Sequence, residues 1–443
     1  MENNIAIITL GCSKNEIDSD LMASLLIRHN YNITEELEKA DIIIVNTCGF
    51  INDAKQESIE IIWEMTKYKT YGNCKYLILA GCLAERYSKE LMKEINEVDG
   101  IIGTGNIGEI VNIIDRLKQD NKIVKTGNIN NDYVENVKRT NYNYSAYVKI
   151  SEGCNNYCSY CIIPKLRGKY RSRPMENIIE EARYLVSNGV KEIILIAQNT
   201  TDYGIDLYDE YKLAELLNEL NKIHDLEWIR ILYMYPDHFT NELIEAIKQN
   251  EKVVKYVDIP IQHINDDILL NMNRKTNKES ITKLIKKLRI EIPDIIIRTT
   301  IIVGFPGEQK KQFDELYDYV KNAKFDRLGV FKYSQEEGTE AYSLEGQVNE
   351  NTKELRKNKL MELQQKLSFD ENQKKIGNTY KVLIEEYIDD NIYTGRTYMD
   401  SPEIDGVVYF KSEKKLSIGT FIFIKIEDCL EYDLMGEIVS EYR

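Results

Sequence analysis

Three cysteines lie close together in the middle of the chain, at Cys154, Cys158 and Cys161. Their C-x3-C-x2-C spacing begins just after a predicted strand at Ala146–Ile150. Three thiolates this close in sequence can hold a four-iron, four-sulfur cluster and leave one iron without a protein ligand. A zinc site would need a fourth ligand, and no further Cys or His is nearby in the sequence. We therefore expect an iron–sulfur cluster with one open coordination position.

This spacing after a strand resembles the radical S-adenosylmethionine superfamily. The resemblance implies that the open iron binds the amino and carboxylate groups of S-adenosylmethionine, and that an electron from the cluster breaks a sulfur–carbon bond of the cofactor. The resulting 5′-deoxyadenosyl radical removes hydrogen from unreactive C–H bonds. The cofactor performs the difficult step and the protein positions it. We call Cys154, Cys158 and Cys161 the radical cysteines.

A second set, Cys12, Cys48 and Cys82, is dispersed in the sequence. Each follows an apolar segment that is typical of a parallel strand, in IAIITLGC, DIIIVNTC and KYLILAGC. The carboxyl ends of such strands line one crevice, where ligands bind. A glycine adjoins each cysteine and would let the backbone approach a bulky ligand, at Gly11, Gly49 and Gly81. We expect a second cluster on these auxiliary cysteines; the alternative is three buried structural thiols.

The composition is that of a globular protein. Of 443 residues, 43% are hydrophobic and 30% are charged, and the net charge of −15 disfavours non-specific binding to phosphate backbones. The first residues lack a basic leader, and no apolar run reaches membrane-spanning length. We expect a cytoplasmic protein whose eight cysteines serve metal binding or catalysis rather than disulfides. Cys74 and Cys429 have no such setting and should be spare thiols.

Apolar strands that alternate with amphipathic helices predict an α/β fold, and the whole pattern predicts three domains. The first, residues 1–138, should hold an N-terminal parallel α/β sheet. Its predicted strands are Ile5–Leu10, Asp41–Asn46 and Tyr76–Ala80, with helices at Ser19–Arg28 and Ala54–Thr66. The polar stretch Lys118–Asn143 marks its end, with a strand or two where that stretch begins.

The second domain, residues 139–375, should be a partial (β/α)6 barrel, because six units are too few for a closed eight-fold barrel. The predicted strands are Ala146–Ile150, Glu192–Ile196, Trp228–Tyr233, Val253–Ile259, Ile295–Val303 and Arg327–Phe331. The predicted helices between them include Met175–Ser187, Phe239–Lys248, Ser280–Leu288 and Gln309–Ala323. A charged helix at Asn351–Lys375 is expected to be a solvated linker.

The third domain, residues 376–443, should be a small all-β barrel, because short strands alternate there with polar turns. The predicted strands are Tyr380–Tyr387, Ile392–Thr397, Gly406–Phe410, Thr420–Ile426 and Gly436–Ser440.

The chain as a whole resembles the methylthiotransferase family. The resemblance implies an N-terminal methylthiotransferase domain with an auxiliary cluster, a radical S-adenosylmethionine barrel and a C-terminal TRAM-like domain. Three sequence motifs are similar to those of the RimO branch of the family: GCSKNEIDSD at 11–20, NTCGFINDAKQESI at 46–59 and KISEGCNNYCSYCIIPKLRGKYRSRP at 149–174. Asn199 departs from the aspartate expected in AQNTTDYG.

Two branches of this family differ in substrate. One modifies an adenosine beside the tRNA anticodon, and the RimO branch modifies an aspartate of small-subunit ribosomal protein S-twelve. The segment from Gly377 to Arg443 holds 7 Lys and Arg against 14 Asp and Glu, a net charge of −7. An acidic tail suits a basic ribosomal protein better than tRNA. We expect the ribosomal protein as partner and no stable nucleic-acid binding; the alternatives are a tRNA enzyme and a non-catalytic iron–sulfur scaffold.

The resemblance further implies how the methylthio group reaches the aspartate β-carbon. A cluster on the auxiliary cysteines would carry the sulfur, and one S-adenosylmethionine would methylate it. A second S-adenosylmethionine, at the cluster of the radical cysteines, would supply the radical that opens the β-carbon. Two four-iron, four-sulfur clusters and an electron donor of flavodoxin or ferredoxin type are therefore expected.

Residues that follow the barrel strands should lie at the active face. Gln198 and His263 are predicted to contact S-adenosylmethionine, and Tyr160 to pack on its adenine; ordinary loop polarity and packing on the cluster are the alternatives. Other candidates on this face are Asn199, Thr200, Gln262, Arg298 and Gly304. The basic stretch Lys165–Arg173 is either a carboxylate clamp or a solvated loop.

Overall fold

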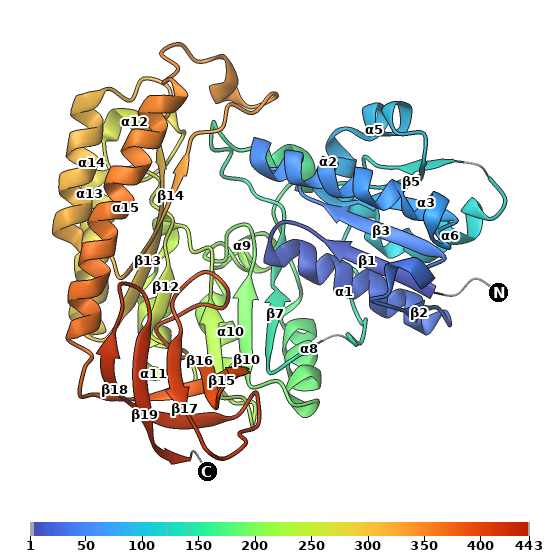
Figure 1. Cartoon of the computed structure of the whole chain (residues 1–443). Coiled ribbons are helices and arrows are strands. Elements are labelled where there is room, and N and C mark those ends of the chain that lie inside the picture. The colour runs from blue at the N-terminus through green and yellow to red at the C-terminus, as the bar shows by residue number, and fades with distance from the viewer. Residues whose placement is uncertain (1–3, 121, 141, 442–443) are drawn as a thin grey trace.

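The first part of the chain forms a parallel sheet (Figure 1). The computed structural model describes residues 4–120, 122–140 and 142–441. The strands, in the order β2-β1-β3-β4-β5-β6, are β1 (Asn4–Thr9), β2 (Asn32–Ile33), β3 (Ile42–Thr47), β4 (Tyr76–Ala80), β5 (Val98–Ile102) and β6 (Ile123–Lys125). The helices are α1 (Ser13–Arg28), α2 (Asn52–Thr66), α3 (Tyr68–Tyr71), α4 (Gly81–Arg86), α5 (Ser88–Glu94) and α6 (Ile110–Leu117), with short 3-10 turns at Leu37–Lys39 and Thr104–Glu109.

The central strand β3 shows why this sheet is covered on both faces. Its side chains are all buried, and they alternate between two apolar clusters. Ile42 and Ile44 pack with α1 and α6, whereas Ile43 and Val45 pack with α2, α4 and α5. A parallel strand that is buried on both faces has a continuous run of apolar residues in its sequence. That pattern is the one from which β3 was predicted.

The three strands predicted for this domain are confirmed to within one residue at either end. A short strand at the start of the polar boundary stretch is also confirmed as β6. The strands β2 and β5 were not predicted. β2 has two residues, and β5 contains Asp99 and Gly100, so neither shows a clear apolar pattern.

The second part of the chain is the open barrel that the six β/α units predict. Two parallel three-stranded sheets, β7-β10-β11 and β12-β13-β14, are joined by a bridge between Ile229 and Val253. The strands are β7 (Ser145–Lys149), β10 (Glu192–Ile196), β11 (Trp228–Ile231), β12 (Tyr256–Asp258), β13 (Ile296–Val303) and β14 (Arg327–Lys332), with a hairpin of β8 (Ser151–Glu152) and β9 (Arg171–Ser172).

Helices cover the outside of this barrel. They are α7 (Ile163–Arg167), α8 (Met175–Ser187), α9 (Ile205–Tyr208), α10 (Leu213–Leu220), α11 (Asn241–Gln249), α12 (Asp266–Asn271), α13 (Lys278–Glu291), α14 (Lys310–Ala323) and α15 (Glu350–Gln373), with 3-10 turns at Pro236–His238 and Glu340–Ser343. The helices share one apolar core with the strands, except α7, whose Leu166 packs with Cys82 of the first domain.

The charged helix α15 is not the solvated linker that its composition predicted. It packs along β14 and α14, and Leu360 and Leu363 join the barrel core. Two of its cations are buried and paired: Arg356 lies 2.9 Å from Glu308, and Lys353 lies 2.7 Å from Glu350. A charge-rich sequence conceals a buried face when its charges find partners.

The last part of the chain forms the predicted five-stranded barrel, which is closed. Its strands are β15 (Thr379–Asp389), β16 (Ile392–Arg396), β17 (Val408–Lys411), β18 (Phe421–Cys429) and β19 (Leu434–Glu441). In Figure 1 this red barrel lies against the lower, amino-terminal ends of the central strands, away from the edge where the radical cysteines follow β7 and β8. The domain boundaries at 138 and 375 stay predictions.

Buried ion pairs join this small barrel to the open one. Arg396 of β16 pairs with Glu192, the first residue of β10, at 2.6 Å, and Arg230 pairs with the same carboxylate at 2.8 Å. Arg298, a candidate for the active face, instead lies mid-strand in β13, 2.8 Å from Asp258 and near the loop of the small barrel. We infer no active-face role for Arg298.

No helix in the described part of the chain is long and apolar enough to cross a membrane.

Candidate active site

The auxiliary cysteines lie in three neighbouring loops at the carboxyl edge of the first sheet. Cys12 immediately precedes α1, Cys48 follows β3, and Cys82 lies in α4, which begins where β4 ends. The strands β1, β3 and β4 are adjacent, so these loops meet. A Cβ atom placed on Gly11 would lie 2.8 Å from the Cβ of Cys48. The sheet therefore gathers three residues that the sequence disperses.

The glycines beside these cysteines make room for neighbouring loops. A Cβ on Gly49 would lie 2.8 Å from the backbone nitrogen of Leu83, and one on Gly81 would lie 2.5 Å from the carbonyl oxygen of Thr47. Gly11 and Gly81 also have φ angles of +96° and +88°, which side-chain-bearing residues rarely adopt. The space that we expected for a bulky ligand is taken by the adjoining loops.

The auxiliary cysteines lie in positively charged surroundings. Cys12 is solvent-accessible, whereas Cys48 and Cys82 are buried. Desolvation by the protein would raise the pKa of Cys12, but Lys14 and Arg167 bring it below its usual value. Burial raises the pKa of Cys48 and raises that of Cys82 to about 11, against the opposing charge of Arg167. Because thiolates bind metal, both cations favour the form that would hold a cluster.

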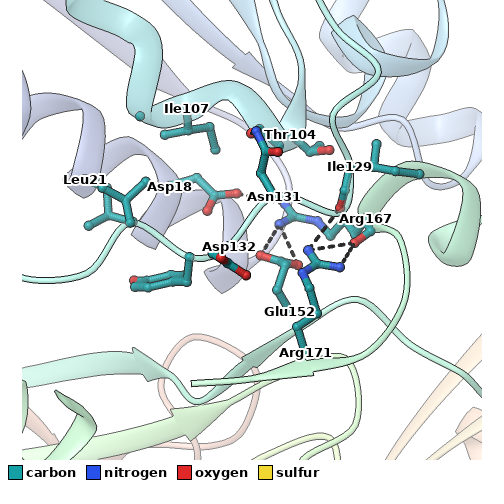
Figure 2. A pocket seen from close by; sticks show the side chains of 14 residues that line it. Asp18, Leu21, Thr104, Ile107, Ile129, Asn131, Asp132, Glu152, Arg167 and Arg171 are labelled. Carbon is teal, nitrogen blue, oxygen red and sulfur yellow. Dashed lines mark hydrogen bonds and ion pairs between the residues drawn. The ribbon is translucent and has the colours of Figure 1, made fainter. Parts of the chain in front are cut away.

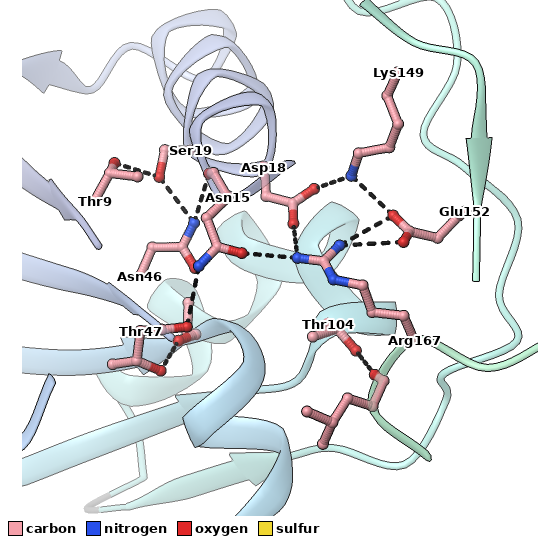
Figure 3. Close-up of polar contacts among 12 residues, drawn as sticks. Thr9, Asn15, Asp18, Ser19, Asn46, Thr47, Thr104, Lys149, Glu152 and Arg167 are labelled. Carbon is pink, nitrogen blue, oxygen red and sulfur yellow. Dashed lines mark hydrogen bonds and ion pairs between the residues drawn. The ribbon is translucent and has the colours of Figure 1, made fainter. Parts of the chain in front are cut away.

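Arg167 reaches this site from the barrel and is fully buried (Figure 3). Its Nη2 donates to Asn15 Oδ1 at 2.8 Å and to Asp18 Oδ2 at 2.9 Å, and its Nη1 donates to Glu152 at 3.1 Å. Lys149 joins the same two carboxylates at 2.6 and 2.8 Å. Two cations thus balance two carboxylates across the interface between the first domain and the barrel.

Asn15 carries this network on to the cysteine loops. Its Nδ2 donates to the carbonyl oxygens of Leu10 at 2.7 Å and of Thr47 at 3.2 Å. Leu10 lies two residues before Cys12, and Thr47 directly precedes Cys48. Arg167 is therefore linked, through the side chain of Asn15, to the loops that carry two of the three auxiliary cysteines.

The short helix α7 adds apolar contacts between the barrel and the loops of the auxiliary cysteines. It begins two residues after Cys161, so it belongs to the loop of the radical cysteines. Ile162 and Leu166 pack with Cys82 in one small apolar cluster. The segment that carries the radical cysteines therefore also contacts the auxiliary cysteines.

The basic stretch Lys165–Arg173 is not simply a solvated loop, because two of its arginines are buried. Arg167 and Arg173 are buried, and Arg173 pairs with Glu135 at 2.7 Å and Glu181 at 2.8 Å. Their carboxylate partners come from the protein itself, so these two arginines already clamp internal groups.

A small cavity lies between the first domain and the barrel (Figure 2). Its volume is about 40 Å³, enough for water but not for S-adenosylmethionine. Its polar lining includes Asp18, Asn131, Asp132, Glu152, Arg167 and Arg171. The cavity is thus part of the interface around Arg167.

The radical cysteines follow β8 on one loop, and all three are partly exposed. Burial raises the pKa of Cys154 to about 11 and also raises that of Cys161, and the nearby Cys158 adds to both shifts. Their mutual influence shows that the three thiols lie together. Without metal, Cys154 and Cys161 should be protonated at neutral pH, and binding a cluster would release these protons.

Arg274 is a buried cation beside the radical cysteines that the sequence did not indicate. Its Nη1 donates to Cys158 Sγ at 3.9 Å, and its Nη2 donates to the carbonyl oxygen of Pro260 at 2.7 Å. The guanidinium also lies 3.8 Å from the ring centroid of Tyr235. Burial opposes its charge, but Tyr160 and Cys158 raise the pKa of Arg274 above its usual range.

The three residues predicted to meet S-adenosylmethionine lie at the same edge of the barrel. Tyr160 is half-buried beside Cys158 and packs on the apolar cluster around Phe305. Gln198 is half-buried two residues after β10. His263 is fully buried; its Nδ1 accepts from the backbone N–H of Asn265 at 3.0 Å, and burial lowers its pKa to about 3.

Several buried polar atoms at this edge lack a hydrogen-bond partner in the described structure. They include Asn199 Nδ2, after β10, and Gln262 Oε1 and His263 Nε2, after β12. Buried polar groups are normally paired, so unpaired ones at the carboxyl edge of a barrel indicate a place for a polar ligand. This observation fits a bound S-adenosylmethionine.

The donor chemistry of both cysteine sets fits iron–sulfur clusters. All six thiols are free, and each set is gathered in one place. In the described residues, no three His, Cys, Asp or Glu side chains converge to hold a single metal ion. Cluster ligands bind separate irons and need not converge on one point.

Three family models match the chain, one in each part. The model described as Uncharacterized protein family UPF0004 matches residues 4–103, the Radical SAM superfamily matches 148–320, and the TRAM domain matches 376–439. The match to the Radical SAM superfamily supports an iron–sulfur cluster and S-adenosylmethionine as cofactors.

Solved structures share the fold at low sequence identity. The radical S-adenosylmethionine methyltransferase TsrM from Kitasatospora setae, with cobalamin and a 4Fe–4S cluster bound, has a TM-score of 0.56 and 12% identity over 89% of this chain and 81% of its own. The cobalamin-dependent radical enzyme OxsB has a TM-score of 0.52 and 12% identity, over 81% of this chain and 55% of its own.

Much more similar relatives match along the full length. Ribosomal protein uS12 methylthiotransferase RimO from Thermoanaerobacter sp. is 53% identical over 98% of this chain and 99% of its own length. The protein of the same name from Clostridioides difficile is 52% identical, with 99% of both chains covered. The chain therefore belongs to the RimO family of ribosomal protein uS12 methylthiotransferases, within the radical S-adenosylmethionine superfamily.

Proposed function

We propose that this enzyme attaches a methylthio group to the β-carbon of an aspartate in ribosomal protein uS12. The names of the full-length relatives support the protein substrate. The presence of two cysteine sets supports two clusters of four irons each, one on the auxiliary and one on the radical cysteines. Because the partner is a ribosomal protein, we also propose that the enzyme works in the cytoplasm.

The observation that carries this proposal is the contact between the two cysteine sets through α7. The helix starts two residues after Cys161, and its last residue, Arg167, lies in the network beside the auxiliary cysteines. A carbon radical must meet its sulfur donor before solvent or protein quenches it. An enzyme for this reaction must hold both sites at one cavity, and proximity is the main service the protein provides.

The chain's own residues would bind and orient the reactants. Cys154, Cys158 and Cys161 would hold a cluster that, with S-adenosylmethionine, would supply a carbon-centred radical. Cys12, Cys48 and Cys82 would hold a cluster that would supply sulfur. Arg274 places a positive charge beside Cys158. We propose that Tyr160, Gln198 and His263 contact S-adenosylmethionine, His263 as a neutral imidazole because burial keeps its pKa low.

The direct test offers both candidate substrates to one preparation. Anaerobically reconstituted enzyme, with S-adenosylmethionine and a reductant, receives a uS12 segment that holds the aspartate and, in parallel, unmodified tRNA. We expect a methylthio mass gain on the uS12 segment, located at aspartate by fragmentation. A gain on tRNA alone would overturn the protein substrate and favour a nucleic-acid enzyme.

The electron donor can be tested in the same system. We propose a flavodoxin or ferredoxin, because the cluster needs single electrons. A reduced flavodoxin should support formation of 5′-deoxyadenosine in place of a chemical reductant. No product with either donor class would contradict this part of the proposal.

A further inference from the structure

Lys14 is a buried lysine beside the auxiliary cysteines. It lies in the first turn of α1, two residues after Cys12, and only 4% of its surface is exposed. In the part of the chain that the structure describes, its Nζ makes no hydrogen bond and no ion pair with a carboxylate. Cys12 itself is solvent-accessible, so an outside group can reach this end of the auxiliary set.

The ammonium of Lys14 extends across the interface to the barrel. It lies 3.1 Å from the ring centroid of Tyr233, two residues beyond the end of β11. Tyr233 is fixed there, because its backbone N–H donates to Asp258 at 2.9 Å and its hydroxyl lies 3.5 Å from Ser13 Oγ. Lys14 therefore lies between the auxiliary cysteines and the carboxyl edge of the barrel, where the radical cysteines also lie.

Other buried cations at this interface have carboxylate partners. Arg167 and Lys149 share Asp18 and Glu152, and Arg173 pairs with two glutamates. Burial of an unpaired charge is costly, and contact with an aromatic ring offsets only part of that cost. Among these cations Lys14 alone has no carboxylate partner in the described residues. Its charge acts on the Cys12 thiolate, and its ammonium is left to receive the carboxylate of a ligand.

From this arrangement we infer that Lys14 binds the carboxylate of the substrate aspartate. The inference rests on the proposed function. The carboxylate of an aspartate is bonded to the β-carbon that must receive sulfur. An ion pair at Lys14 would thus hold that carbon next to Cys12 and facing the barrel. A lysine suits this task because it is a compact charge that binds a single carboxylate oxygen at close range.

The test is a two-by-two comparison on the anaerobically loaded enzyme. Wild type and Lys14→Met each bind two dye-labelled uS12 segments, one with the aspartate and one with asparagine in its place, and anisotropy gives the affinities. We expect wild type to prefer the aspartate segment at least about tenfold and Lys14→Met to bind both equally. Lys14→Arg should recover part of the preference. A preference that survives in Lys14→Met would overturn the inference.

Two controls separate this role from others. Lys89→Met, at an exposed residue of α5, should keep the wild-type preference and the wild-type iron content. The rate of 5′-deoxyadenosine formation by Lys14→Met without substrate shows whether this variant still binds S-adenosylmethionine as wild type does. A slower rate that more S-adenosylmethionine restores would assign Lys14 to the cofactor carboxylate and overturn the inference. If Lys14→Met does not fold, Lys14→Gln takes its place in the same comparison.

Failure of the inference and failure of the proposed function give different results. If wild type modifies the uS12 segment but Lys14→Met discriminates as wild type does, only the role of Lys14 is wrong. If wild type leaves the uS12 segment unmodified and modifies tRNA, the proposed function is wrong.

Discussion

The auxiliary and the radical cysteines differ in how the chain gathers them. The radical cysteines lie on one short loop, which their spacing reveals. The auxiliary cysteines come from three loops that meet only because β1, β3 and β4 are neighbours in a sheet. A local motif tolerates changes elsewhere in the fold, whereas a site built by topology depends on every contact that holds its loops in place.

Their electrostatic surroundings differ as well. Lys14 and Arg167 lower the pKa of Cys12 against desolvation. At Cys154 of the radical set, as at Cys82 of the auxiliary set, burial prevails and raises the pKa to about 11. Two buried cations surround the first set, and Arg274 stands beside the second. The lowered pKa of Cys12 is therefore the feature that distinguishes the auxiliary set.

Removal of either set should have the largest effect and should separate the two roles. With Cys154, Cys158 and Cys161 changed to alanine, iron should fall from about eight to about four per chain, and 5′-deoxyadenosine should not form. With the auxiliary cysteines changed to alanine, iron should fall equally but 5′-deoxyadenosine should still form. Iron analysis and mass spectrometry check both results. Full iron in either variant would show that the ligand assignment is wrong.

Loss of Arg167 should test how far the auxiliary site depends on distant contacts. Arg167→Met leaves the buried Asp18 and Glu152 with one cation fewer, so we expect the free energy of unfolding to fall by about 3–5 kcal/mol. Urea unfolding of the cluster-free protein measures this change. The exposed Arg183→Met should stay within about 0.5 kcal/mol of wild type. Equal stability of the two variants would contradict the role assigned to Arg167.

The sequence predicted most of the architecture and both cysteine sets, but neither arginine contact. The strands and their order of appearance follow from local patterns of apolar residues. Arg167 and Asp18 are 149 positions apart, and Arg274 and Cys158 are 116 apart. No local sequence pattern indicates such distant pairs. The basic stretch Lys165–Arg173 could therefore equally be interpreted as a solvated loop. The same limit applied to α15, whose buried charges pair with partners that composition does not reveal.

A smaller effect should come from the glycines that let the auxiliary loops touch. Gly81→Ala would place a Cβ 2.4 Å from Asn46 Oδ1, whereas Gly127→Ala, at a similar φ of +95°, meets nothing within 4 Å. Both variants carry backbone strain, so their difference isolates the loop contact. We expect Gly81→Ala to cost about 1–3 kcal/mol more in unfolding free energy. Equal losses would mean that the loops can separate without penalty.

The buried His263 should make the barrel sensitive to acid. Its folded pKa of about 3 lies below its value of 6.5 in the unfolded chain, so the unfolded state binds a proton first. Stability from this group is complete above pH 6.5 and falls as the pH drops toward 3, by about 1.4 kcal/mol per pH unit. Unfolding of the cluster-free protein at several pH values should show a shallower slope in His263→Asn.

The smallest expected effect concerns the charge beside the radical cysteines. Arg274→Met removes a cation that favours the reduced, more negative cluster, so its reduction potential should fall by some tens of millivolts; about 59 mV corresponds to 1.4 kcal/mol. Potentiometric titration followed by electron paramagnetic resonance measures the shift. The potential of the other cluster should not move. A common shift of both would show that Arg274 does not distinguish the two sites.

The five-residue helix α7 also limits how this protein can be recombined with its relatives. It is part of the barrel domain in sequence, but Leu166 and Arg167 contact the loops of the first domain that carry the auxiliary cysteines. A chimera joined near residue 140 would therefore combine one protein's loops with another's Arg167 and Leu166. We expect a folded chimera only when the donor's residues 162–173 are transferred together with its first domain. The segment that must be exchanged as a whole therefore extends past the boundary between the two domains.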